Sequence, residues 1–196
     1  MRSYEFAMAH IAVACLAGLS ASVAHAQPPQ SATPHPGLER IQADASPDTR
    51  AEWDRKVARM IRAGALRLRE ERKTGPATRD QWFVQLHKGV PVEGTELWRQ
   101  LEDRTTLSIE GTLFDDITID PVPRLTRAEA QAALQALAPD RLMSSRAPEL
   151  VVLPIDGTFL LTYKARVFLG TELATHYVDA NTGRLVRSDA APGPPR

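Results

Sequence analysis

Cysteine is nearly absent from this 196-residue chain, which contains only Cys15. That residue lies inside an apolar opening segment with the features of an export signal. Removal of the segment would leave no thiol to form a disulfide, to act as a nucleophile or to bind a metal. The exported chain would then have to fold without covalent cross-links.

An excess of charge of either sign is also missing, because 24 lysine and arginine residues are balanced by 24 aspartate and glutamate residues. Proteins that bind nucleic acid or anionic membranes in a general way use a basic excess. We therefore expect no nucleic-acid partner. A second exported protein is the kind of partner that this composition favours.

The motifs of common enzyme sites are missing as well. After the opening segment the histidines are His35, His87 and His176, and none has another histidine within five residues, so the H-E-x-x-H motif of zinc proteases is absent. There is no G-x-S-x-G motif and no glycine loop for phosphate. The aspartates at 115, 116 and 120 lack the glycine and the later glutamate of a calcium loop. We predict no catalytic residue, no metal site and no cofactor.

Residues 1–26 are predicted to be a signal peptide. Arg2 gives a positive start, Phe6–Val23 is mostly apolar and small, and Ala24–Ala26 fits a small-x-small cleavage site. We expect a secreted or periplasmic protein with no stable membrane anchor after cleavage. A transmembrane anchor and a lipid attached at Cys15 are the alternative interpretations of the same segment.

The ends of the exported chain are predicted to be unfolded. Residues 27–49 are rich in Pro, Gln, Ser and Ala, which is typical of a disordered leader, and residues 189–196 form a Pro- and Gly-rich flexible tail. From Thr49 to about Lys73, apolar residues recur every three or four positions, and this spacing predicts a helix. Its stripe consists of Trp53, Val57, Met60, Ile61, Ala65 and Leu68.

An antiparallel meander is predicted next, over Trp82–Leu113. Trp82, Val84 and Leu86 alternate with other side chains as in a strand, and residues 96–101 and 107–113 supply two further short runs. Pro91 has no backbone donor, so its segment belongs at a sheet edge or in a turn.

A second helix and sheet are predicted over residues 121–188. Thr126 and Glu129 form a capping box at the start of the helix. Residues 150–153, 158–168 and 175–186 are predicted as three strands, with a turn at 179–183. Together with the helix and meander of residues 50–120, this predicts an α+β fold of two small helix-plus-antiparallel-sheet units in series.

Two stretches carry a resemblance to a known family. Phe83-Val84-Gln85 followed by Lys88-Gly89-Val90-Pro91-Val92-Glu93-Gly94 resembles the propeptide (FTP) domain of thermolysin- and fungalysin-type metalloproteases. Leu161–Val167 followed by Tyr177–Val186 resembles the PepSY module of the same pro-regions, so the resemblance covers about Trp82–Val186. It implies a cystatin-like arrangement of each unit. The matching residues, expected to be structural, are Phe83, Gln85, Gly89, Pro91, Val92, Gly94, Tyr163, Tyr177, Asp179 and Gly183.

The sequence also departs from the family pattern. Glu93 stands where the family usually has an aromatic residue, and Thr95 replaces a second glycine. If Leu97 and Leu101 face the core, Trp98 points to the opposite face, where it is a candidate contact for a partner. A small hydrophobic cluster of Trp98 with Trp82 is the alternative.

The resemblance implies a function without catalysis. Family members use this region to assist folding of the attached protease and to block its cleft. A free-standing copy would therefore bind an exported zinc metalloprotease as an inhibitor or a folding assistant. Two alternatives remain open: the truncated pro-region of a thermolysin- or fungalysin-type zymogen, and a general envelope protein-interaction module.

Overall fold

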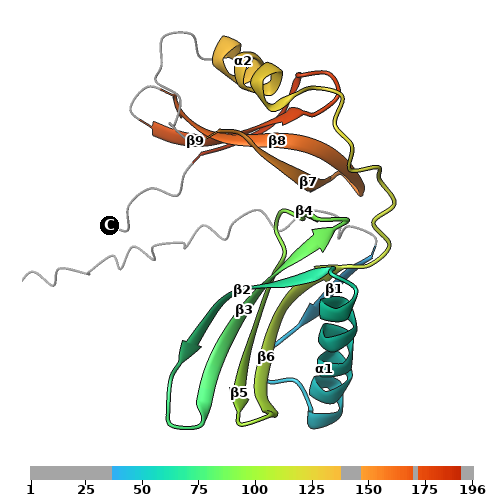
Figure 1. Cartoon of the computed structure of the whole chain (residues 1–196), viewed down its shortest axis with the longest axis vertical. Coiled ribbons are helices and arrows are strands. Elements are labelled where there is room, and N and C mark those ends of the chain that lie inside the picture. The colour runs from blue at the N-terminus through green and yellow to red at the C-terminus, as the bar shows by residue number, and fades with distance from the viewer. Residues whose placement is uncertain (1–36, 138–146, 170–171, 191–196) are drawn as a thin grey trace, which may run out of the picture. The chain divides into compact units, whose positions relative to one another are not determined.

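The computed structural model describes residues 37–137, 147–169 and 172–190, apart from the side chains of residues 168, 169 and 172 (Figure 1). All of these residues belong to one compact unit, Thr33–Arg196. The predicted signal peptide, leader residues 27–36 and tail residues 191–196 lie outside the described ranges. No helix in the described ranges has both the length and the apolar character needed to cross a bilayer.

The first sheet is antiparallel and has the strand order β1-β6-β5-β3-β2, with β4 paired to β3 at one side. Its strands are β1 (Leu38–Ile41), β2 (Leu66–Lys73), β3 (Thr78–His87), β4 (Val90–Pro91), β5 (Glu96–Glu102) and β6 (Thr105–Phe114). The meander predicted from the alternation of Trp82, Val84 and Leu86 corresponds to β3, β5 and β6. Pro91 lies in the two-residue β4, off the main path of the sheet, as its missing donor predicted.

The leader prediction was wrong over residues 38–49. Leu38–Ile41 forms β1, which pairs with β6 from Leu38 opposite Phe114 to Ile41 opposite Gly111. Helix α1 (Pro47–Arg62) then begins inside the predicted leader. A four-residue strand leaves little trace in composition, and its partner lies some seventy positions away in the sequence. Its pairing therefore depends on the folded sheet.

The first helix is shorter than predicted. It begins after Ser46, whose hydroxyl accepts a hydrogen bond from the backbone N–H of Thr49 at 3.2 Å, and it ends at Arg62. Gly64 follows with a φ of 68°, a left-handed conformation that suits the end of a helix. Residues 66–73, predicted as helix, form β2 instead. Leu68, assigned to the helical stripe, is 45% exposed on that strand.

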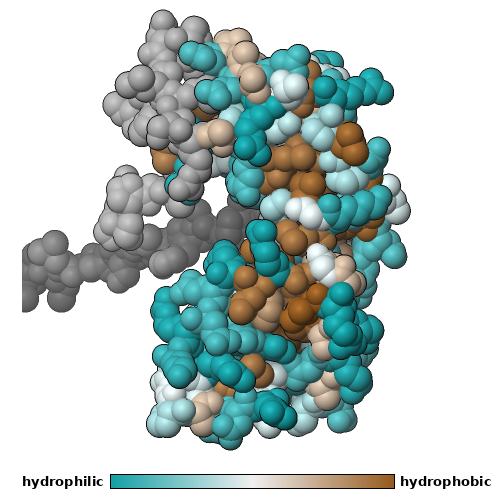
Figure 2. Space-filling view, in the orientation of Figure 1, coloured by the Kyte–Doolittle hydropathy of each residue, from teal (hydrophilic) through white to brown (hydrophobic). Residues whose placement is uncertain are grey.

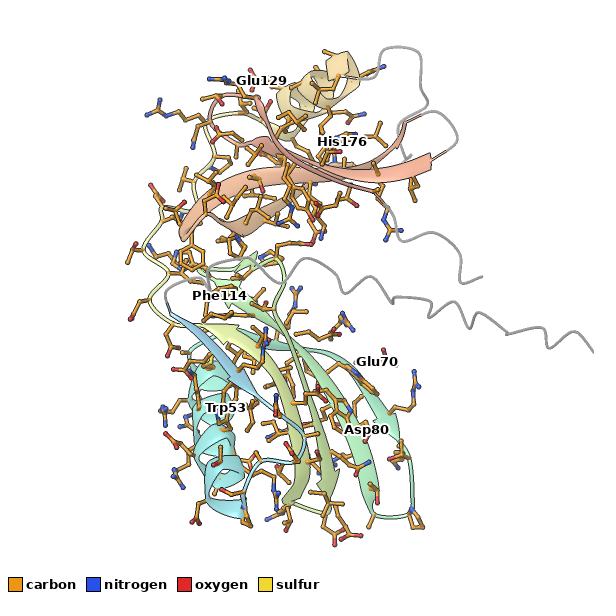
Figure 3. All side chains as sticks on the ribbon, turned by 180° about the vertical axis from the view of Figure 1, so that it is seen from behind. Trp53, Glu70, Asp80, Phe114, Glu129 and His176 are labelled. Carbon is orange, nitrogen blue, oxygen red and sulfur yellow. The ribbon has the colours of Figure 1, made fainter. Side chains whose placement is uncertain are left out.

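The core of the first sheet lies between α1 and one face of the strands (Figure 3). Trp53 and Val57 of α1 are buried together with the strand residues Ile41, Leu66, Phe83, Leu97, Ile109 and Leu113. Leu97 is fully buried and Leu101 is nearly so, which confirms that this face of β5 points into the protein.

The second sheet is antiparallel with the order β10-β9-β8-β7, and α2 (Arg127–Leu137) contacts β8 and β9. Its strands are β7 (Glu149–Ile155), β8 (Thr158–Leu169), β9 (Glu172–Asp179) and β10 (Leu185–Ala190). The prediction of three strands was wrong because the turn at residues 179–183 divides the third stretch into β9 and β10. The tail predicted from residue 189 onward is likewise too long, because β10 includes Asp189 and Ala190.

The capping box predicted at the start of α2 is confirmed. The Glu129 carboxylate accepts from the backbone N–H of Thr126 at 2.7 Å, and the Thr126 hydroxyl accepts from the backbone N–H of Glu129 at 3.3 Å. The hydrogen bonds that the Glu129 carboxylate accepts from the backbone N–H and from the hydroxyl of Thr126 lower the pKa of Glu129. The described chain is broadly α+β: two helices and two antiparallel sheets, with most of its residues in strands.

Candidate functional site

Residues 88–94, the glycine-containing motif of the first matching stretch, form a folded loop between β3 and β5. The chain turns back at Lys88 (φ 47°) and Gly89 (φ 89°), so that Val90 of β4 pairs with His87 of β3. Gly94 has a φ of 75°, which strongly favours glycine. The Thr95 hydroxyl donates to the backbone carbonyl of Val92 at 2.7 Å and closes the loop. Gly89 and Gly94 therefore set the backbone path of this loop.

The side chain of Gln85, near the end of β3, forms hydrogen bonds with the end of β6. Its buried side-chain amide donates to the carbonyl of Phe114 at 2.6 Å, and its amide oxygen accepts from the N–H of Phe114 at 2.8 Å. Its own backbone carbonyl accepts from the N–H of Val92 at 3.0 Å. One side chain thus joins strands that lie 29 positions apart in the sequence.

The tip of the loop contacts the second sheet. Val92 forms a parallel bridge with Val152 of β7 and is buried among the residues that lie under α2. The backbone N–H of Glu93 donates to the carbonyl of Val152 at 2.8 Å. Hydrophobic side chains are visible around β4 and β7 in Figure 2. The motif therefore builds the junction between the two sheets.

Glu93, noted above as a departure from the family pattern, has its carboxylate bound by the second sheet. One oxygen accepts from Lys164 Nζ at 2.8 Å and the other from the Tyr177 hydroxyl at 3.1 Å. Burial, followed by the charge of Glu93 and its hydrogen bond, raises the pKa of Tyr177 to about 12. The Arg187 guanidinium lies over the Tyr177 ring at 4.8 Å. The sequence marked Glu93 as unusual but could not identify these partners.

Tyr163, Asp179 and Gly183 are the other matching residues of the second stretch. The Tyr163 hydroxyl donates to the carbonyl of Leu125 at 2.9 Å, which ties β8 to the segment before α2. Asp179 accepts from the backbone N–H groups of Asn181 and Thr182 at 2.9 and 2.7 Å, forming the predicted turn. Gly183 completes this turn with a φ of 72°.

Trp98 lies directly opposite Trp82 in the pairing of β3 with β5, on the face of the sheet away from α1. Both indoles are half-buried, and neither belongs to a hydrophobic core cluster of the described residues. The Arg72 guanidinium lies 5.4 Å from the Trp82 ring centre. Glu70 and Asp80, which are labelled in Figure 3, lie on the neighbouring positions of β2 and β3. The two tryptophans thus form a cross-strand aromatic pair bordered by charged groups.

Within the described ranges, no group of three or more His, Cys, Asp or Glu side chains could hold a metal ion. Two of the three aspartates in residues 115–120 contact other groups of the protein. Asp115 forms an ion pair with Lys56 at 2.9 Å, and Asp120 accepts from the backbone N–H of Val122 at 3.3 Å. His176, to which the sequence analysis gave no role, is buried on β9 near α2 (Figure 3). Among the described residues, neither of its ring nitrogens has a hydrogen-bond partner. Burial lowers the pKa of His176.

The chain is similar to a protease. It is 29% identical over 120 residues to the thermostable neutral protease NprT of Geobacillus stearothermophilus. The match covers 53% of this chain and 22% of that protein, so the chain spans less than a quarter of the length of this relative. The similarity is consistent with the resemblance to metalloprotease pro-regions given by the two sequence stretches.

Other comparisons add little about function. The sequence matches no protein-family model. The Bacillus megaterium YpeB C-terminal domain aligns with a TM-score of 0.41 at 14% identity, over 78% of this chain and 68% of that one. A likeness of this size carries no conclusion about activity or partners.

Proposed function

We propose that this chain is a non-catalytic, propeptide-like protein that binds an exported zinc metalloprotease of the thermolysin type and acts as its inhibitor or folding assistant. The observation that carries this proposal is the similarity to a neutral protease over about half of the chain. The two motif stretches of the pro-region resemblance support it. A secreted or periplasmic location, reached through the predicted signal peptide, is part of the proposal.

The face of the first sheet that carries Trp82 and Trp98 is the candidate surface for the protease. Aromatic side chains are enriched among the residues that contribute most to binding energy, because they bury a large area with few rotatable bonds. The pair is already ordered by the strand register and by the contact of Arg72 with Trp82. Such preorganisation reduces the entropy lost on binding.

A binding and inhibition assay tests the proposal. The purified chain is titrated against secreted neutral metalloproteases, and both complex formation and residual peptidase activity are measured. We expect Trp98→Ala to weaken binding about tenfold or more, as for a central aromatic contact. Leu185→Ala is the matched control, because Leu185 is an exposed apolar residue on β10 of the other sheet. It should leave the affinity unchanged.

Two results would count against the proposal. A folded wild-type chain that neither binds nor alters any thermolysin-type protease, and does not improve the yield of active enzyme on refolding, would overturn the function. Binding that Trp98→Ala and Leu185→Ala reduce equally would retain the function but remove the tryptophan face from the interface.

A further inference from the structure

The junction between the two sheets has an apolar part and a polar part. Val92 and Phe114 of the first sheet lie in the cluster under α2, and the Phe114 ring meets the Phe159 ring edge to face, with centroids 5.4 Å apart. The polar part consists of Glu93, whose carboxylate binds Lys164 and Tyr177. The junction also contains the bridge of Val92 with Val152 and the hydrogen bond from the backbone N–H of Glu93 to the carbonyl of Val152. The segment between β6 and α2 connects the sheets covalently.

The strand register of the second sheet brings together the two side chains that bind the Glu93 carboxylate. Lys164 of β8 and Tyr177 of β9 are direct cross-strand partners, so both side chains project from the same face of the sheet. The side chains of Glu93 and Lys164 retain only 24% and 29% of their exposure. Partial burial reduces screening, so this pair couples more strongly than an ion pair on the open surface.

Each sheet also has a core of its own. The cluster beneath α1 contains residues of the first sheet and α1 only, and Val151, Leu153 and Tyr177 form a cluster within the second sheet. Opening of the junction would remove Val92 and Phe114 from the cluster under α2, which they share with the second sheet, but would leave the other two clusters in place. The cluster beneath α1 and the cluster of Val151, Leu153 and Tyr177 therefore do not depend on the junction.

We propose that Glu93, Lys164 and Tyr177 form a latch that holds the two sheets in one orientation, and that the protein binds its protease as a single body when this latch is closed. The claim about protease binding rests on the proposed function, whereas the latch itself rests on the contacts alone. A carboxylate supplies this link because it can accept from a lysine and a tyrosine at once. An aromatic residue at position 93 could not form an ion pair with Lys164.

The orientation of the sheets can be measured directly. Spin labels are attached at Arg67→Cys on β2 and Leu185→Cys on β10, two exposed positions, in a chain that carries Cys15→Ser. We expect one narrow distance distribution for the parent chain and a broad one after Glu93→Ala or Lys164→Ala. Glu93→Gln removes the charge but keeps the volume of the side chain. Broad distances in this variant as well would therefore not be due to a folding defect caused by lost volume. Glu149→Gln is the matched control, because Glu149 lies 3.8 Å from the same lysine but belongs to the second sheet itself.

Limited proteolysis gives a second readout that needs no partner. Arg124 is exposed in the connecting segment, and trypsin cleavage after it should accelerate about fivefold in Glu93→Ala, as expected for the loss of a coupled contact. The double variant Glu93→Ala, Lys164→Ala should cleave no faster than the single variants, because either change opens the same latch. Unchanged distances and cleavage rates in Glu93→Ala and Glu93→Gln would overturn the latch.

The binding clause is tested separately. Latch variants that show broad distances yet bind the protease as tightly as the parent chain would overturn the claim that binding needs a closed latch. Weaker binding in the latch variants, with Glu149→Gln unaffected, would support it. If no protease binds even the parent chain, the proposed function fails, while the distance and proteolysis results still decide the latch.

Discussion

The two sheets use their faces differently. In the first sheet, buried residues lie beneath α1, while the opposite face presents the half-buried Trp82 and Trp98. In the second sheet both faces hold buried residues: one cluster lies under α2, and Val151, Leu153 and Tyr177 form another on the opposite side. Burial on both faces stabilises the second sheet, whereas the first sheet keeps one face partly open to solvent.

The largest difference should appear between two adjacent residues of β5. Leu97→Ala removes a fully buried side chain from beneath α1 and should lower the free energy of unfolding by about 3 kcal/mol. Trp98→Ala removes one member of the half-buried aromatic pair and should cost only about 1 kcal/mol. Urea denaturation of both variants measures the contrast. Equal losses would show that the tryptophan face is a second core and not a surface.

A smaller effect is expected from the buried amide at the end of the first sheet. Gln85→Leu loses both hydrogen bonds to the backbone of Phe114 and should lower the free energy of unfolding by about 2 kcal/mol. Gln100→Leu, on the tryptophan face, loses one bond to Asp80 at 3.1 Å and should cost about 0.5 kcal/mol or less. A Gln85→Leu variant as stable as Gln100→Leu would contradict the role assigned to Gln85.

The mildest change should come from His176 in the second sheet. Burial lowers its pKa in the folded state below the ordinary value of 6.5, so the unfolded chain takes up the proton first on acidification. The stability associated with this neutral histidine is complete above pH 6.5 and is lost as the pH falls from there towards the folded pKa. His176→Gln should remove this pH dependence. The measurement is thermal unfolding of both chains across this range, and identical profiles would exclude His176 as its source.

Much of the local structure could be predicted from the sequence. The capping box of Thr126 and Glu129, the turn after Asp179 and the position of Pro91 off the main sheet follow from interactions within a few residues, or from a missing donor. Alternation along β5 predicted that Leu97 and Leu101 share one face and that Trp98 lies on the other. These features depend on backbone geometry that each residue carries with it.

The errors in the fold arose where a local pattern allowed two structures. Ala65 and Leu68 continue the helical spacing of α1, but residues 66–73 also fit a strand, and pairing with β3 decided for the strand. Gly64 was the available signal, because a glycine just after a helical stripe often ends the helix. For β1 the sequence had no comparable marker.

The sequence by itself determined the turn after Asp179, the capping box at the start of α2 and the position of Pro91 off the main path of the sheet. Tertiary structure alone decided that Glu93 binds Lys164, 71 positions away, and Tyr177, 84 positions away. It also placed Trp82 opposite Trp98. Turns and caps depend on forces between near neighbours, whereas these pairings arise only when distant strands settle into one register and bury their shared surface.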